Sequence, residues 1–304
     1  MKKFGQGKRG PKAALARQTR LQVAEPVELM PFLMEQLPAQ TRNNIKSLLT
    51  HRQVIVNDKV ITQYNHPLRP GQEVVINWAL VRAQDKIKGL KIIYEDADLI
   101  VIDKPAGLLS MASDEEKQHT AYHQLTDYVR IDNPEYRIFI VHRLDRDTSG
   151  VMLFAKNEAV KRALQDKWKE VVTDRAYIAV VEGRVKKQTD TVRSWLLETK
   201  TGLMYSGSKA GDGLEAITHY RLLQANDKYS LLEIRLETGR KNQIRAHMKD
   251  IGHSIVGDKK YGASTNPLGR LGLHAHILAF HHPTTGELLR FETEVPKIFT
   301  RLFK

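Results

Sequence analysis

The pattern of apolar and polar positions divides the chain into two parts with different predicted elements. In residues 21–80, apolar positions at helical spacing predict a helix that ends near Pro38 and a second helix that Thr41 caps. Short β-branched runs then flank Asn57 and Asp58, a dipeptide that favours a tight turn. This part is therefore expected to form a compact domain of two helices and small strands.

From residue 91 onward, apolar runs typical of strands dominate, and helical patterns occur between them. Leu232, Ile234 and Leu236 alternate with charged residues, as expected for a half-buried strand. Helical periodicity covers residues 158–172 and 242–251. Because strands predominate and helices intervene irregularly, the expected fold class is α+β with a mostly antiparallel mixed sheet. Further strands are predicted at 92–94, 99–102, 138–141, 151–154 and 176–181.

The two ends of the first part are expected to lack regular structure. Residues 1–20 contain seven basic residues and no acidic residue, with few apolar positions, which predicts a disordered tail that attracts phosphate. A solubilising tail without a partner is the alternative. Residues 81–90 carry mixed charges and predict a linker, so the second part is expected to span 91–304. The candidate phosphate contacts in the tail are Lys2, Lys3, Lys8 and Arg9.

Composition narrows the function further. The 304 residues include 48 Lys and Arg against 35 Asp and Glu, a formal net charge of +13 that favours a polyanionic partner, most commonly nucleic acid. A basic enzyme with another partner is the alternative. The chain has no cysteine, which excludes disulfides, thiolate metal sites and a cysteine nucleophile. With no long apolar run and no secretory signal, we expect a cytoplasmic protein without membrane contact, and a monomer.

The first part resembles the S-four RNA-binding domain. The resemblance implies that its second helix docks on folded RNA through Arg42, Lys46 and Arg52, whereas a merely solvated helix face is the alternative. Asp58 departs from the glycine usual at the turn, although aspartate tolerates such backbone angles. The segments that carry the resemblance are "FLMEQLP", "TRNNIKSLL", "VIVND" and "LRPGQEVVI".

The segment 142–150 has a high density of reactive side chains. It places two acids, two arginines and a histidine between apolar strands, and such a loop on a rigid scaffold is typical of a site. From the residues alone, Asp145 or Asp147 is a candidate nucleophile or general base, and Arg143 or Arg146 a candidate phosphate contact. A salt-bridged turn is the alternative.

The second part resembles the RluA-type pseudouridine synthases over about residues 91–296. Members of that family convert a uridine in RNA into its carbon-linked isomer, and the resemblance implies neither a cofactor nor a metal. The matching segments occur in the order of the family: "YEDADLIVIDKPAGL", "VHRLDRDTSGVMLFAKN", "RAYIAVVEG", "ITHYRLL", "ETGRKNQIRAHM" and "LHAHILAFHHPTTGELLRFETEVP".

The resemblance also assigns roles to individual residues. Asp145 matches the catalytic aspartate, which must be ionised to act at either the ribose or the base of the uridine. Tyr177 matches the tyrosine that stacks on the target base, and Arg245 matches the arginine that pairs with the aspartate. Arg143 matches a residue that fills the space left by the flipped nucleotide, and Leu273 would line the base pocket.

Each assignment has a structural alternative. Tyr177 can be a packing residue of its strand, and Arg245 can belong to a solvated basic face with Lys241 and Lys249. Asn242 and Lys241 stand where the family commonly has His and Thr, a departure expected to alter loop contacts. The histidines at 274, 276, 281 and 282 are expected to be structural rather than metal ligands, because no carboxylate lies at ligand spacing nearby.

The leading hypothesis is an RNA pseudouridine synthase that acts on ribosomal RNA of the large subunit, with transfer RNA as the alternative substrate. A second hypothesis is a catalytically idle RNA-binding or ribosome-assembly factor on the same fold. A third is a hydrolase of glycosidic bonds that uses Asp145 and Asp147 as its carboxylate pair.

Overall fold

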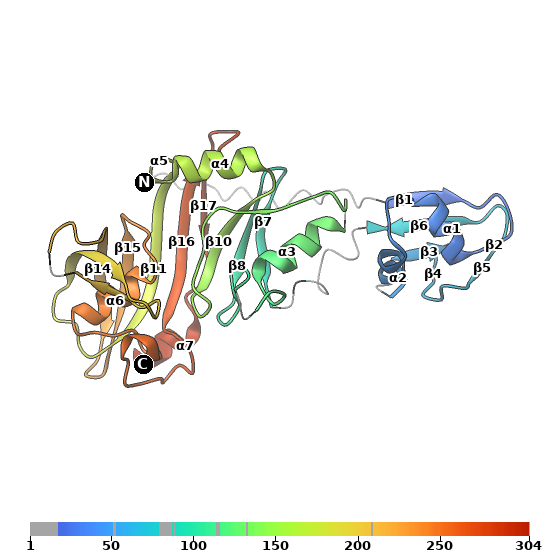
Figure 1. The fold of residues 1–304 in the computed structure, drawn as a ribbon. Coiled ribbons are helices and arrows are strands. Elements are labelled where there is room, and N and C mark those ends of the chain that lie inside the picture. The colour runs from blue at the N-terminus through green and yellow to red at the C-terminus, as the bar shows by residue number, and fades with distance from the viewer. Residues whose placement is uncertain are drawn as a thin grey trace, which may run out of the picture. The chain divides into compact units, whose positions relative to one another are not determined.

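In a computed structural model, the protein folds as two compact units (Figure 1). The first unit comprises Met1–Lys88 with Thr126–Tyr136, and the second Gly89–Leu125 with Arg137–Lys304. The structure describes residues 18–50, 53–78, 87, 89–113, 116–131, 133–207 and 209–303.

The first unit contains a four-stranded antiparallel sheet and the two predicted helices. The sheet order is β1-β6-β3-β4, and a separate short ribbon joins β2 to β5. The backbone N–H of Asn44 donates to Thr41 Oγ1 at 3.3 Å, the contact expected from a capping threonine. The elements are β1 (Gln18–Gln22), β2 (Val27–Glu28), α1 (Leu29–Gln36), α2 (Arg42–Thr50), β3 (Val54–Val56), β4 (Lys59–Val60), β5 (Pro67–Leu68) and β6 (Glu73–Asn77).

Apolar residues from both helices and the sheet form the core of this unit, with Leu33, Ile45 and Ile76 fully buried. At the β3–β4 turn, Asn57 and Asp58 have φ values of 44° and 63°. Both lie in the left-handed region, which asparagine and aspartate tolerate better than other non-glycine residues. This explains how the turn forms without the glycine usual at that position.

The start of the chain differs from the prediction. The tail was expected to extend to residue 20, but β1 begins at Gln18 and pairs with β6. Trp78 Nε1 donates to Thr19 Oγ1 at 2.8 Å, and Arg20 pairs with Glu73. These cross-strand contacts order a segment whose charge alone had suggested disorder. Residues 1–17 lie outside the described part of the chain.

The second unit is built on one large sheet of order β13-β12-β14-β15-β11-β16-β10-β8-β7, with β17 beside β16 and β9 beside β10. Every strand pair described is antiparallel except β10 with β16, which confirms the predicted α+β class. The strands are β7 (Lys91–Glu95), β8 (Leu99–Lys104), β9 (Phe139–Ile140), β10 (Ser149–Ala155), β11 (Val172–Glu182), β12 (Thr189–Glu198), β13 (Met204–Ser206), β14 (Leu214–Ala225), β15 (Tyr229–Leu236), β16 (Leu273–His281) and β17 (Leu288–Glu292).

Short helices accompany the sheet. The helix predicted over 158–172 is interrupted at Lys167, and Val172 already begins β11. Asn157 caps the first piece by accepting a bond of 2.8 Å from the N–H of Val160. Described helices of the chain beyond the first two are α3 (Ala121–Arg130), α4 (Glu158–Asp166), α5 (Trp168–Val171), α6 (Gln243–Asp250), η2 (Lys259–Tyr261), α7 (Lys297–Thr300) and η3 (Arg301–Phe303). No helix in the described ranges has the length and apolar character needed to cross a membrane.

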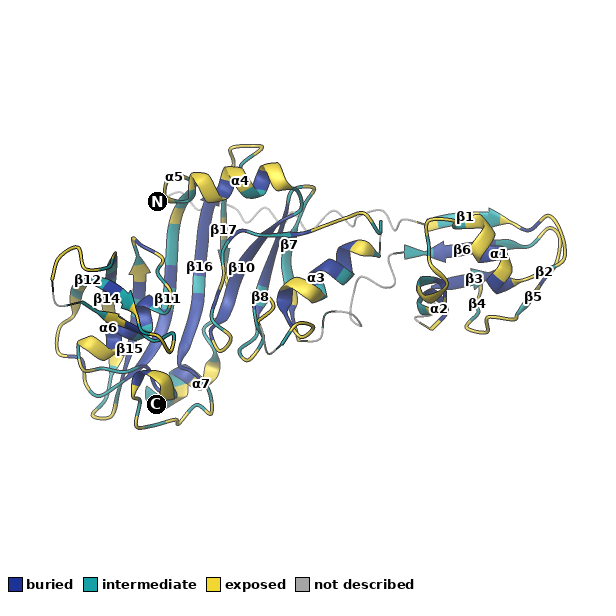
Figure 2. Ribbon diagram, viewed as in Figure 1, coloured by how far each residue is buried: buried dark blue, intermediate teal, exposed yellow. Residues whose placement is uncertain are grey.

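The centre of the sheet is its most buried part (Figure 2). All seven residues of β10 are buried, and Ser149 and Gly150 pair with His274 and Ala275 of β16 in the short parallel segment. Gly150 has φ +113°, and a Cβ built on it would lie 2.0 Å from the carbonyl oxygen of Ala275. Glycine is therefore required where the two strands meet, immediately after the loop that carries Asp145.

Candidate active site

The loop between β9 and β10 holds Asp145 and is fixed at its start by hydrogen bonds of two side chains, Ser110 and His142. Ser110 Oγ donates to the carbonyl of Leu144 at 2.6 Å and accepts from the N–H of Leu144 at 3.1 Å. His142 Nε2 accepts from the N–H of Leu153 at 3.0 Å. Burial, reinforced by Arg175, lowers the pKa of His142 to about 3, so the ring is neutral and acts as an acceptor.

A fully buried lysine supports the middle of this loop. Lys104, at the end of β8, donates from Nζ to the carbonyls of Pro105 at 3.0 Å, Leu108 at 2.7 Å and Arg146 at 3.0 Å. Burial lowers the pKa of Lys104 to about 7, against the opposing effect of Asp147 and Asp145. The lysine therefore ties the segment after β8 to the residue that follows Asp145.

The end of the loop is joined to β16. Ser149 Oγ lies 2.8 Å from His274 Nδ1, and Arg270 Nη2 donates to Ser149 Oγ at 2.8 Å and to the carbonyl of Leu273 at 3.2 Å. Burial lowers the pKa of His274 to about 4, which keeps the ring neutral. The backbone around Asp145 is thus supported on both sides by buried polar groups.

Arg245 of α6 contacts Asp145, which lies 100 positions earlier in the sequence. Its Nη1 donates to Asp145 Oδ2 at 3.1 Å, while Nε and Nη2 contact the two oxygens of Asp258 at 2.7 and 2.8 Å. Its side chain is 14% exposed and that of Asp258 is 1% exposed, so Arg245 does not belong to a solvated basic face. Burial opposes the charge of Arg245, but Asp258 and Asp145 outweigh it and raise the pKa of the guanidinium.

Asn242 forms a second contact with Asp145. An amide oxygen facing two carboxylate oxygens would be repelled, so the amide nitrogen of Asn242 faces Asp145, at 2.7 Å from Oδ2 and 3.1 Å from Oδ1. The amide oxygen then accepts from the hydroxyl of Tyr261 at 3.1 Å. Tyr261 in turn accepts from the N–H of Met204 at 3.1 Å. Asn242, the residue that departs from the family motif, therefore contacts the candidate catalytic carboxylate directly.

The predicted site residues line one pocket of about 70 Å³. Tyr177 of β11 and the buried Leu273 of β16 lie in its wall with Asp145, Arg245 and the exposed Arg143. Burial raises the pKa of Tyr177, the negative charge of Asp145 adds to this effect, and Arg175 opposes it. Its hydroxyl is therefore protonated at neutral pH. The arrangement presents one carboxylate, held by cationic and neutral donors, beside an aromatic side chain.

Four residues of this arrangement were not predicted as site residues. Lys104 and Tyr261 lack a local signal, because the contacts that tie them to the site reach Arg146 and Asn242, which lie elsewhere in the sequence. Asn242 carried a signal only as a departure from the resembled motif. For Asp258, the signal is an acid between turn-forming glycines in the segment "VGDKKYG".

The remaining predicted residues belong to the first unit, to the start of the chain or to the histidines of the second unit. Arg42 and Lys46 lie exposed on α2, while Arg52 and the tail residues Lys2, Lys3, Lys8 and Arg9 lie outside the described part of the chain. His276 and His282 contact the carbonyl of Thr293 and the carboxylate of Asp96 respectively. Within the described ranges, no group of three or more His, Cys, Asp or Glu side chains is arranged to hold a metal ion.

Comparison with known families defines the class of protein. The family model described as RNA pseudouridylate synthase matches residues 98–250, which include Asp145, Tyr177 and Arg245, and the S4 domain model matches residues 29–74. The chain therefore belongs to the RNA pseudouridylate synthase family and carries an S4 domain. This confirms the enzyme class predicted from the sequence, an isomerase of uridine in RNA.

Individual relatives match over most of the chain. This chain is 34% identical over 272 residues to the Uncharacterized RNA pseudouridine synthase YlyB of Bacillus subtilis (strain 168). The aligned region covers 87% of this chain and 89% of the relative. The chain is also 34% identical over 236 residues to the Ribosomal large subunit pseudouridine synthase D of Zymomonas mobilis, covering 71% and 72%. The structure of Human RNA Pseudouridylate Synthase Domain Containing 1 matches with a TM-score of 0.55 and 28% identity, covering 67% of this chain and 83% of that chain.

Proposed function

We propose that this protein isomerises specific uridines in structured RNA of the large ribosomal subunit, with Asp145 as the catalytic carboxylate. The observation that carries the proposal is the contact of Asp145 with Arg245, itself held by Asp258, in a pocket lined by Tyr177. An adjacent guanidinium favours the ionised form of a carboxylate and fixes its orientation.

The reaction moves the attachment of the base from N1 to C5 and conserves every atom. The bond from the ribose C1′ to N1 of uracil breaks, the base turns and a bond from C1′ to C5 forms. C5 then loses its proton, and N1, freed from the ribose, gains one. Asp145 acts either by attack on C1′ or by addition to the base, and both routes need its ionised carboxylate. Because burial raises the pKa of Tyr177, its side chain stays neutral and offers an aromatic face on which the uracil stacks.

Access to the glycosidic bond requires that the nucleotide leaves its stack, at a cost of a few kcal/mol. Basic contacts remote from the reacting bond offset this cost. The S4 domain supplies Arg42 and Lys46 on α2, and the exposed Arg143 at the Asp145 pocket is suited to occupy the space that the nucleotide leaves. Residues 1–17 add further positive charge for the same purpose.

The choice of RNA is supported by one relative, named as a large-subunit enzyme. Transfer RNA is the competing substrate, and a large-subunit target implies the cytoplasmic location expected from the sequence. Mapping pseudouridines in the total RNA of cells with and without the gene tests the proposal: one or more positions in large-subunit RNA should disappear and return with the wild-type protein. Loss confined to transfer RNA would contradict the choice of target.

Asp145→Asn tests the chemistry. The variant should bind RNA with wild-type affinity and form no pseudouridine, whereas Asp147→Asn, at an exposed position two residues away, should remain active. Full activity of Asp145→Asn contradicts the assignment. Release of free uracil, lost equally in both variants, would identify a hydrolase that uses the two acids as a pair.

A further inference from the structure

A second and larger cleft adjoins the Asp145 pocket. It has a volume of about 730 Å³, within the range of pockets that hold small ligands, and shares Arg143, Tyr177, Leu236 and Arg240 with that pocket. Its other walls come from the α4–α5 junction, the start of β11 and the loop after β15. An RNA strand whose target nucleotide occupies the Asp145 pocket can therefore continue directly into this cleft.

The cleft is rich in positive charge without carboxylate partners. Five cationic side chains line it against three acidic ones, Asp166, Glu170 and Glu237. Among the described residues, none of the five cationic side chains forms an ion pair with a carboxylate. Unpaired cations around a concave surface attract a polyanion. The five are Arg143, Lys167, Lys169, Arg175 and Arg240.

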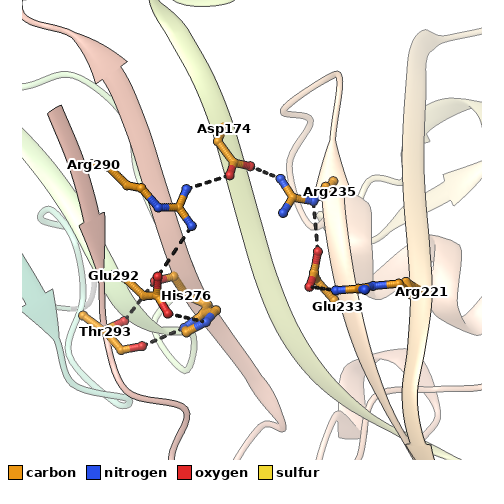
Figure 3. A network of polar contacts seen from close by, with 8 residues as sticks. All are labelled: Asp174, Arg221, Glu233, Arg235, His276, Arg290, Glu292 and Thr293. Atoms are coloured by element: carbon orange, nitrogen blue, oxygen red, sulfur yellow. Dashed lines mark hydrogen bonds and ion pairs between the residues drawn. The ribbon is translucent and has the colours of Figure 1, made fainter. Parts of the chain in front are cut away.

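A neighbouring network of charged side chains shows the reverse arrangement (Figure 3). Asp174 and Arg235 immediately neighbour the cleft residues Arg175 and Leu236 in sequence. Asp174 pairs with Arg235 and Arg290, and Glu233 pairs with Arg221 and Arg235. The arginines of this network are therefore neutralised by carboxylates, unlike the five cationic side chains of the cleft.

Arg175 is held in place for a ligand. Its Nη2 donates to the carbonyl of Leu236 at 3.3 Å, and its guanidinium lies 5.8 Å from the ring centroid of Trp168. Gly239 leaves room for it, since a Cβ at that position would lie 3.0 Å from Arg175 Nη1. Arg175 is two residues before Tyr177 on β11, and both line the cleft. A backbone phosphate bound by Arg175 would therefore lie close to the target base.

We propose that single-stranded RNA immediately adjacent to the target uridine runs through this cleft, with one of its phosphates bound by Arg175. The inference rests on the proposed function, because it places the strand relative to a uridine at Asp145. Phosphate contacts fix the register of a nucleic acid without reading its sequence. The cleft thereby determines which uridine of a flexible segment enters the pocket.

The binding test compares Arg175→Gln with Arg235→Gln, a matched control on the neighbouring strand whose guanidinium is ion-paired and does not line the cleft. Full-length proteins that also carry Asp145→Asn are titrated with fluorescein-labelled oligouridylate over a range of salt concentrations. Loss of one phosphate contact should reduce the slope of log K against log salt by about 0.7 for Arg175→Gln. Arg175→Lys should restore the slope, and Arg235→Gln should leave it unchanged. Equal slopes in all variants, or equal binding of polyglutamate, would overturn the proposal.

The position of the phosphate is tested with a ribosomal RNA fragment that the wild-type enzyme modifies. Neutral methylphosphonate linkages are introduced one at a time on both sides of the target uridine. One linkage next to the target should lower kcat/KM of the wild type and of Arg235→Gln, but have no additional effect in Arg175→Gln. Additive effects at every linkage would refute the contact. If the wild type modifies no RNA, the proposed function fails, while the salt slopes still report on the cleft.

Discussion

Asn242 and Asp145 are joined by a hydrogen bond of 2.7 Å, formed where the backbone of Asn242 adopts the left-handed conformation with φ 50°. This hydrogen bond and the ion pair between Asp145 and Arg245 are both supported by residues 258–261. Asp258 holds Arg245, and Tyr261, three residues later, holds Asn242. Asp258 also caps η2, on which Tyr261 lies, by accepting from the N–H of Tyr261 at 3.2 Å. One short segment therefore orients the candidate catalytic carboxylate through two routes.

Asn242→Asp should move the acid limb of the pH–rate profile to higher pH by about one unit or more. The substitution preserves the shape of the side chain but places a second carboxylate beside Asp145, and two carboxylates in one site do not ionise independently. At neutral pH, kcat should fall more than KM changes. Single-turnover rates between pH 5 and 9 provide the measurement.

Asn242→Gly, which keeps the left-handed backbone without the amide, should lower kcat and move the acid limb less than Asn242→Asp does, because it removes a donor to Asp145 without adding a negative charge. Lys241→Ala serves as the control, because Lys241 belongs to the same loop but pairs with Glu198 on the surface. A profile of Asn242→Asp that coincides with that of the wild type would refute a direct electrostatic contact with Asp145.

Asp258→Asn should reduce both activity and stability. The substitution removes the charge that pairs with a largely buried Arg245, and breaking a buried ion pair costs about 3–5 kcal/mol. Urea unfolding of the full chain measures the loss. Asp174→Asn is the matched control, since Asp174 also bridges two arginines but in a half-exposed network, where we expect about 1 kcal/mol or less. Equal losses in the two variants would contradict the role assigned to burial.

Lys104→Met should remove a pH dependence of the free energy of unfolding that comes from the buried amine of Lys104. Between pH 7 and the ordinary lysine pKa of 10.5, the unfolded chain retains a proton that folded Lys104 has released. The free energy of unfolding of the wild type should therefore rise relative to the variant across this window, by at most ~1.4 kcal/mol per pH unit. A difference between the two proteins that is independent of pH would contradict the lowered pKa.

Gly150→Ala should destabilise the second unit by about 3–5 kcal/mol, because the added methyl group meets the carbonyl oxygen of Ala275 in a left-handed backbone region. Gly211→Ala is the control. Gly211 also has positive φ, +89°, but no atom lies within 4 Å of the added Cβ, so only the backbone cost of about 1 kcal/mol applies. Thermal unfolding distinguishes the two, and similar melting temperatures would show that β10 and β16 separate readily.

Local patterns predicted the elements that have a clear period or boundary, such as α2 with its threonine cap and β15 with its alternation. The strand β16 was not predicted, since nearly all its residues are buried and its sequence therefore lacks alternation. Asp145, Tyr177 and Arg245 were identified through the family resemblance rather than by periodicity. Asn242, Asp258 and Lys104 were missed because their contacts depend on the three-dimensional fold and leave no period in the sequence.

The short parallel pairing of β10 with β16 has a consequence for the order of biosynthesis. Ser149 and His274 meet across 125 positions, so a growing polypeptide on the ribosome exposes the Asp145 loop long before its partner strand is translated. Lys104 and Ser110 are already available to fold the loop, but Arg245, Asp258 and Leu273 are not. The S4 domain is complete earliest of all. A nascent chain thus acquires its means of binding RNA first and its chemistry last, and prematurely terminated products would compete for the substrate without modifying it.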